Sequence, residues 1–311
     1  MSAIPLDVGR IPSFKHKVFS VRDLQRICVI GLGLLGGSIS SAIRQRAPQM
    51  SVVGYSHRPA TRVKARALAI ATEIADDLPS ALANADLVIL ATPIFTFEQY
   101  FADINGLIRT DCIVTDVGST KLLPHRWAGE RLTRGAPYVG SHPIAGSEQR
   151  GVEFARDDLF VDARCILTAT ETTSGQAVRA LKRFWSALGC FIEVMTPTEH
   201  DRVLANVSHL PHVLAAGLVN ASDAGDMKSA GKGFLDSTRI ASGPANVWTD
   251  VLLANTDNLV EGIDRVIAEL AAIRQALKAE DRQTIDAFLD GACRKRAALV
   301  KYKIRKKELL S

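Results

Sequence analysis

The stretch YVGSHPIAGSE, Tyr138 to Glu148, contains one of the seven histidines of the chain, placed between a glycine-serine pair and a proline. An imidazole exchanges a proton near neutral pH, so His142 could act as an acid or a base. A histidine at a strand end that bonds to nearby backbone is equally common. Other polar groups must reach the same place before a catalytic role is favoured.

Two other apolar runs also end in polar residues. The run DLVIL is followed by Ala91, Thr92 and Pro93, and CIVTDVGSTK ends with Ser119 and Lys121. The carboxyl ends of parallel strands form the ligand crevice of an open α/β sheet. The sequence therefore predicts that Ser119, Lys121 and His142 lie over one crevice, although Ser119 could also be the N-cap of a helix before Lys121.

The glycines of VIGLGLLGGS fit the pattern G-x-G-x-x-G, directly after one predicted strand and at the start of a helix. This spacing lets the backbone turn tightly and approach a pyrophosphate at the helix N-terminus. We expect a dinucleotide to bind here, at Gly31, Gly33, Leu34, Leu35 and Gly36 and at the strand end Ala91, Thr92 and Pro93. The alternative is a glycine-rich turn without a ligand.

The end of the next predicted strand reads GYSHRPATR. NAD-binding proteins usually have Asp or Glu there to accept hydrogen bonds from the ribose hydroxyls, whereas this chain has Ser56, followed by His57, Arg58 and Arg62. Donors and cations suit a 2′-phosphate, so NADP is predicted over NAD. A solvated basic loop is the alternative.

The elements that must position these residues change character along the chain. Short β-branched runs alternate with helical patterns up to about residue 195, which predicts a doubly wound, mainly parallel, Rossmann-like sheet. Strand signals then vanish, and one long helix carries an apolar stripe of Leu259, Ile263, Val266, Leu270, Ile273 and Leu277. We predict a dinucleotide-binding domain over residues 1–195, with 1–25 as an extension, and an all-helical substrate and dimerisation domain over 196–311.

Composition narrows the protein class. The charge of +5 and pI of about 9.0 are concentrated in the basic tail CRKRAALVKYKIRKKELLS rather than on a surface rich in aromatic residues, which argues against a nucleic-acid binder. Five cysteines without CxxC spacing indicate a reducing compartment and no metal site. No apolar run could act as a signal peptide or span a bilayer. We expect a cytoplasmic homodimer, without membrane or nucleic-acid partners, that is built on the helical half.

Five motifs occur in order: GLGLLGGS, DVGSTK, GSHPIAGSE, SHLPH and GFLDSTRIA, the last followed by Trp248. Together they resemble the prephenate and arogenate dehydrogenases of tyrosine biosynthesis. The resemblance implies oxidative decarboxylation of a cyclohexadienol, with His142 accepting the hydrogen bond of the ring hydroxyl and Ser119 beside it. It also implies that Arg239, Ser208 and His212 contact the substrate and that Trp248 is an aromatic substrate residue near the partner's site, while His209 is structural. For Trp248, plain core packing is the alternative.

One departure is Leu235, where the family often has a basic residue before Asp236. A β-hydroxyacid or 6-phosphogluconate-type dehydrogenase is one rival function, but its lysine has no counterpart between Thr196 and Ala224. A non-catalytic NADP-binding sensor is another. The choice between prephenate and arogenate stays open, with a slight preference for arogenate suggested by the basic cofactor loop.

Overall fold

The computed structural model describes residues 24–146 and 149–305, which form two compact units. The first unit extends to Asp201 and also includes residues 243–254. The second unit comprises residues 202–242 and the residues from Asn255 onward. Two predicted terminal segments lie partly outside the described residues: 1–23 of the N-terminal extension and 306–311 of the basic C-terminal tail. Nothing in the sequence pattern predicted the return of residues 243–254.

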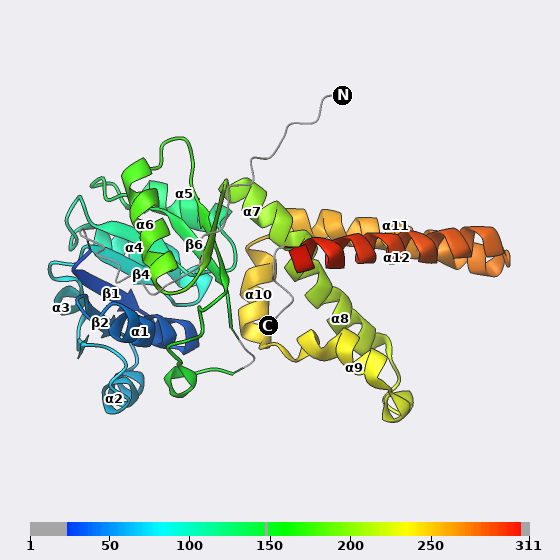
Figure 1. Cartoon of the computed structure of the whole chain (residues 1–311), viewed down its shortest axis with the longest axis horizontal. Coiled ribbons are helices and arrows are strands. Elements are labelled where there is room, and N and C mark those ends of the chain that lie inside the picture. Colours follow the sequence, from blue (N-terminus) through cyan, green and yellow to red (C-terminus); the bar gives the residue numbers. More distant parts are fainter. Residues whose placement is uncertain (1–23, 147–148, 306–311) are drawn as a thin grey trace. The chain divides into compact units, whose positions relative to one another are not determined.

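The first unit contains the strands and most of the shorter helices (Figure 1). They are, in order, β1 (Arg26–Ile30), α1 (Leu34–Arg46), β2 (Ser51–Tyr55), α2 (Pro59–Ala67), β3 (Glu73–Ile74), α3 (Leu78–Leu82), β4 (Leu87–Leu90), η1 (Ile94–Thr96), α4 (Phe97–Asn105), β5 (Ile113–Asp116), α5 (Leu122–Arg131), β6 (Gly140–Ile144), η2 (Val152–Phe154), β7 (Arg164–Thr168), α6 (Gly175–Ala187), β8 (Phe191–Met195), the start of α7 (Pro197–Leu204) and α10 (Ala245–Leu253).

A five-stranded parallel sheet is the centre of this unit, in the order β3-β2-β1-β4-β5. Successive side chains of β1 enter two different cores: Ile27 and Val29 pack in the cluster that includes α1 and α6, and Cys28 and Ile30 in the cluster that includes α4 and α5. A strand buried on both faces is apolar there, which explains the continuous run ICVI from Ile27 to Ile30. The predicted Rossmann-like fold is confirmed.

A second, three-stranded sheet has the order β6-β7-β8, with β6 antiparallel to β7 and β7 parallel to β8. We expected these strands to continue the parallel sheet, which is wrong; the two sheets meet at an isolated bridge between Val114 and Tyr138. Pro143 in β6 has no N–H to donate, so β6 is suited to the edge of a sheet. His142 is the third residue of β6, paired with Ile166, and not at the strand end.

The second unit is helical, as predicted. It holds the end of α7, a π-helical turn η3 (Ala205–His209), α8 (Leu210–Ala221), η4 (Asp226–Ser229), α9 (Lys232–Thr238), η5 (Arg239–Ser242), α11 (Thr256–Lys278) and α12 (Arg282–Arg305). The long helices α11 and α12 pack along each other (Figure 1). Within the described residues, no helix is long and apolar enough to cross a membrane.

The predicted apolar stripe on α11 is only partly covered. Leu259 is buried, whereas the side chains of Leu270 and Leu277 are 57% and 59% exposed. In a lone chain, the far part of the stripe therefore does not belong to the core.

Two backbone segments approach each other closely in the turn between β1 and α1. A Cβ on Gly36 would lie far inside van der Waals contact with the carbonyl oxygen of Gly31, whereas a Cβ on Gly33 would meet nothing within 4 Å. The backbone of Gly33 is extended, a conformation open to any residue. Two glycines of one motif thus have different physical reasons to be glycine.

This difference predicts two different effects on folding. Gly36→Ala should lower the free energy of unfolding by about 3 kcal/mol because backbone must move to admit the methyl group. Gly33→Ala should change it by no more than about 0.5 kcal/mol, since the space is open. Urea unfolding of both variants measures this, and equal stabilities would contradict the account of the turn.

Candidate active site

The β1–α1 turn has the form that a dinucleotide requires. Gly31 has φ +100°, and a Cβ there would lie 2.5 Å from the Ala91 carbonyl oxygen. Gly33 is the N-cap of α1, without a side-chain cap, and the first turn of the helix has no acidic residue. The N–H groups of this helix end, with open space beside Gly33, fit a bound pyrophosphate. Leu34 and Leu35 begin the helix, both half-buried.

The crevice is placed by the sheet order, because β1 lies between β2 and β4. This is the topological switch point, where open α/β sheets bind their ligands. The N–H of Ala91 donates to the carbonyl of Ile30 at 2.7 Å, which ties the end of β4 to the glycine turn. The hydroxyls of Thr92 and Thr96 lie 2.7 Å apart, and Thr96 donates to the Pro93 carbonyl.

At the end of β2, Ser56 is buried and its hydroxyl accepts the N–H of Arg58 at 3.3 Å. Arg58 precedes Pro59 and has ψ 115°, the extended backbone expected before proline. His57 and Arg58 are exposed, and no contact of the Arg58 guanidinium is found among residues 24–146 and 149–305. Arg58 is therefore a cation available at the strand end.

Arg62 differs from Arg58. Its guanidinium donates to the carbonyl of Ser56 at 2.7 Å and lies 3.3 Å from Asp76, which also binds Arg66. Arg62 therefore holds the loop after β2 through the Ser56 carbonyl and Asp76, and it is less suited than Arg58 to bind a phosphate.

The loop after β5 carries Ser119, which is half-buried. The expectation that Ser119 caps the following helix is wrong, because α5 begins at Leu122 and its N-cap position is Lys121. The expectation that Lys121 lies over the crevice is also wrong. Its ammonium is fully buried, paired with Asp116, and donates to the carbonyls of Gly118 and Thr120 at 2.8 and 3.1 Å.

This buried ion pair holds the Ser119 loop in one shape. Asp116 also accepts the Gly118 N–H at 2.8 Å and the Tyr138 hydroxyl at 2.7 Å. Burial, more than the neighbouring carboxylate, raises the pKa of Tyr138 well above 10, so the phenol stays a donor. Because the hydrogen bonds of the lysine ammonium go to Asp116, Gly118 and Thr120, the pair fixes the backbone on both sides of Ser119.

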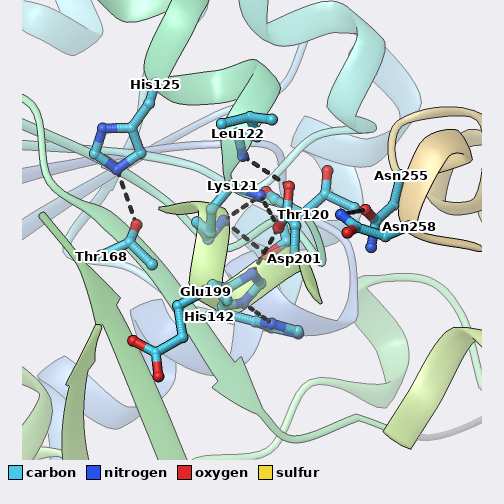
Figure 2. A network of polar contacts seen from close by, with 12 residues as sticks. Thr120, Lys121, Leu122, His125, His142, Thr168, Glu199, Asp201, Asn255 and Asn258 are labelled. Atoms are coloured by element: carbon cyan, nitrogen blue, oxygen red, sulfur yellow. Dashed lines mark hydrogen bonds and ion pairs between the residues drawn. The ribbon is translucent and has the colours of Figure 1, made fainter. Parts of the chain in front are cut away.

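His142 contributes to a chain of three side chains (Figure 2). Its Nδ1 lies 2.9 Å from Nε2 of His200, and Nδ1 of His200 lies 2.7 Å from Oδ1 of Asp201. His142 is half-buried, while His200 and Asp201 are 0% and 1% exposed. The arrangement of a partly accessible imidazole backed by a buried ring and a carboxylate suits general base chemistry.

The same carboxylate starts helix α5. Asp201 Oδ1 accepts the N–H of Lys121 at 2.7 Å, and Oδ2 accepts the N–H of Leu122 at 2.8 Å. These N–H groups have no partner within the helix, so Asp201 supplies the cap that no local side chain provides. Figure 2 shows Asp201 close to both residues.

The sequence motifs did not point to His200 and Asp201. A local signal did exist: Thr196, Pro197 and Glu199 form a helix-start pattern, and the Thr196 hydroxyl accepts the Glu199 N–H at 3.1 Å. That pattern predicts the helix, but it does not predict the contact of His200 with His142, which is 58 positions away in the sequence.

Three predicted substrate residues lie in the second unit. Ser208 is in the π-helical turn, where the N–H of Leu210 donates to the carbonyl of Ala205, five residues back. Pro211 lacks the N–H that an α-helical turn would use, which favours the wider turn. Such π turns are frequent at functional sites.

His212 is buried in α8, and this burial lowers its pKa below the usual 6.5, so its ring is neutral at physiological pH. Arg239 is exposed at the start of η5. His209, expected to be structural, is buried and lies 3.1 Å from the Asn255 amide. Trp248 is on α10, in the first unit, and half-buried.

Comparisons with known proteins agree with this architecture. Residues 39–194 match the family model described as prephenate dehydrogenase, nucleotide-binding domain, and residues 196–290 match prephenate dehydrogenase, dimerization domain. The prephenate dehydrogenase of Bacillus subtilis (strain 168) is 36% identical over 276 residues, covering 86% of this chain and 74% of that protein.

Solved structures are similar over nearly the whole chain. Prephenate dehydrogenase from Aquifex aeolicus, in complex with hydroxyphenyl propionate and NAD+, has a TM-score of 0.80 and 31% identity, covering 89% of this chain and 98% of that one. Synechocystis arogenate dehydrogenase has a TM-score of 0.77 and 27% identity, covering 88% and 100%. With both domain models and a relative of this identity matched in one chain, the protein belongs to the prephenate dehydrogenase family.

Proposed function

We propose that this protein oxidises and decarboxylates prephenate, arogenate or both, with transfer of hydride to NADP, as a step of tyrosine biosynthesis. The observation that carries the proposal is the hydrogen-bonded chain from His142 to His200 and Asp201, in the unit that also holds the dinucleotide turn. Family membership supports the substrate class.

The substrate ring carries a hydroxyl on C4 and, on the opposite carbon, a carboxylate that leaves as CO2. When bound, the nicotinamide accepts the hydride from C4. The departing hydride and CO2 leave an aromatic ring, and this flow of electrons is helped by a base that accepts the hydrogen bond of the C4 hydroxyl. We assign that role to His142, and to Ser119 the role of orienting His142 and the ring from the rigid loop after β5.

The substrate carboxylate is assigned to Arg239, because a guanidinium fork offers two parallel hydrogen bonds. Arg239 should bind the carboxylate only moderately tightly, since strong stabilisation of the ionised carboxylate would slow its loss as CO2. Ser208, as a hydroxyl in the π turn, and His212, as a neutral imidazole, are assigned to the substrate side chain. Trp248 is assigned to the aromatic lining of the substrate site of the partner subunit.

NADP is proposed as the cofactor on the basis of the β2–α2 loop. Ser56 lacks the negative charge that would repel a 2′-phosphate, and Arg58 provides an exposed cation beside it. The exposed His57 is a further donor.

We propose that the protein acts as a homodimer through the second unit. The matched domain is described as a dimerization domain, and α11 and α12 expose large apolar side chains that another chain could cover: Ile267, Leu270, Leu277 and Leu289. All five cysteines are free thiols, which supports a reducing, cytoplasmic location.

Turnover assays separate this function from its rivals. The absorbance of reduced nicotinamide should rise with prephenate or arogenate and stay flat with 6-phosphogluconate. Turnover of 6-phosphogluconate alone would identify a β-hydroxyacid-type enzyme, and cofactor binding without any turnover would identify a sensor. Comparing kcat/KM for prephenate and arogenate then decides the substrate.

Replacing His142 tests the base. His142→Asn should lower kcat by roughly 10²- to 10⁴-fold, the range for a positioned acid-base group, with KM little changed. Steady-state kinetics under saturating cofactor measures this. A kcat within a few-fold of wild type would show that His142 is only structural.

Replacing Arg239 tests carboxylate binding. Arg239→Lys keeps the charge but loses the fork, which should cost about 1.5 to 3 kcal/mol and raise KM for the substrate roughly 10- to 100-fold. The matched control is Arg274→Lys, an exposed arginine on α11 of the same unit. If KM stayed constant and cofactor binding weakened instead, the assignment of Arg239 would be wrong.

Replacing loop residues tests the cofactor. Arg58→Ala should lower kcat/KM roughly 10- to 100-fold with NADP and hardly with NAD, because only NADP carries the phosphate. Ser56→Asp should shift the preference in the same direction by repulsion. Arg66→Ala is the control, since that guanidinium is committed to Asp76 and the Ile74 carbonyl. A wild type that uses NAD better would refute the proposal.

A further inference from the structure

We propose that His200 and Asp201 are positioning residues that decide which nitrogen of His142 carries its proton, so that Nε2 of His142 is the acceptor. This inference deepens the proposed function and rests on it for its consequence in catalysis. It concerns residues of the first unit only.

The direction of hydrogen bonding is unambiguous at Asp201. Its carboxylate is buried and accepts backbone N–H groups from Lys121 and Leu122. Oδ1, which accepts from Lys121, also lies 2.7 Å from Nδ1 of His200. A carboxylate already engaged by two donors acts as an acceptor, so Nδ1 of His200 must donate.

The direction then passes along the chain of rings. A neutral imidazole has one N–H and one acceptor nitrogen, so a His200 that donates from Nδ1 accepts at Nε2. Nε2 of His200 lies 2.9 Å from Nδ1 of His142, which must therefore carry the hydrogen. The second nitrogen of His142, Nε2, is left as the acceptor.

This direction matters because the opposite tautomer would fail. The substrate hydroxyl must donate a hydrogen bond and therefore needs an acceptor. An Nε2–H group on His142 would offer a donor instead. His142 is only half-buried, so solvent alone would not select one tautomer. The fully buried His200, bonded on both sides, supplies the selection.

The same carboxylate links this selection to the Ser119 loop. Asp201 holds the first N–H groups of α5, directly after residues 116–121, which the buried ion pair of Asp116 and Lys121 shapes. The position of His200 and the end of the Ser119 loop therefore share one anchor. For this reason a substitution of Asp201 would disturb both, and His200 is the better residue to change.

The tautomers themselves can be measured. In wild-type protein with ¹⁵N-labelled histidine rings, two-bond ¹H–¹⁵N spectra should show both His142 and His200 protonated on Nδ1 and not on Nε2, with resonances assigned from His142→Asn and His200→Gln. This readout needs no turnover. An Nε2–H signal from His142, or a doubly protonated His200, would overturn the inference even if the enzyme is active.

Kinetics of two variants tests the consequence. His200→Phe keeps a ring but removes the acceptor, so kcat should fall roughly 10- to 100-fold with KM little changed, the effect typical of a lost supporting contact. His200→Gln can accept from His142 through its amide oxygen and should regain activity to within roughly 10-fold of wild type. A His200→Phe enzyme with wild-type kcat would contradict the proposal.

The control is His125→Gln. His125 is a half-buried histidine of the same unit, bonded at 2.9 Å to the hydroxyl of Thr168. It should keep kcat within about 3-fold, the small effect expected when no catalytic contact is lost. If His200→Phe does not fold, the wild-type spectra and His200→Gln still decide the matter. A wild type that turns over neither prephenate nor arogenate would refute the proposed function while leaving the tautomers measurable.

Discussion

The carboxylate of Asp201 is the contact on which the arrangement of the candidate site depends. It accepts the N–H of Lys121, the N-cap of α5, the N–H of Leu122, the first residue of α5, and the ring N–H of His200, and it is 1% exposed. A buried carboxylate is costly unless donors surround it, and here there are three: two backbone N–H groups from the distant Lys121 and Leu122, and the ring of the neighbouring His200. Satisfying one charge thus brings the start of α5 to the start of α7, and with α7 comes the ring that contacts His142.

The second fixed element is the ion pair of Lys121 and Asp116. Both groups are fully buried, and the lysine is held within residues 116–121 by carbonyls as well as by the carboxylate. A buried pair of this kind contributes little net stability but strongly disfavours other conformations, because either charge alone would be stranded. The loop that carries Ser119 therefore has a defined shape without any contact from a ligand.

Around these contacts, the parallel sheet provides the geometry for the cofactor. The order β3-β2-β1-β4-β5 puts the glycine turn and the end of β4 at the switch point, and the positive φ of Gly31 lets the chain pass close to the Ala91 carbonyl. The three-stranded sheet then holds His142 on β6, a strand that Pro143 confines to an edge.

The sequence by itself determined the elements and the family. Continuous apolar runs, the glycine spacing and the apolar period of α11 are local patterns, and local patterns predict strands, a turn and helices. The five motifs singled out His142, Ser119 and Arg239 as candidate site residues. Tertiary structure alone decided which groups contact each other. Lys121 forms a buried ion pair with Asp116, and Asp201 caps a helix 79 positions away. The ring of His142 contacts the ring of His200. Contacts between distant segments leave no periodic trace in the chain, because they arise only when buried polar groups must find partners in the folded core.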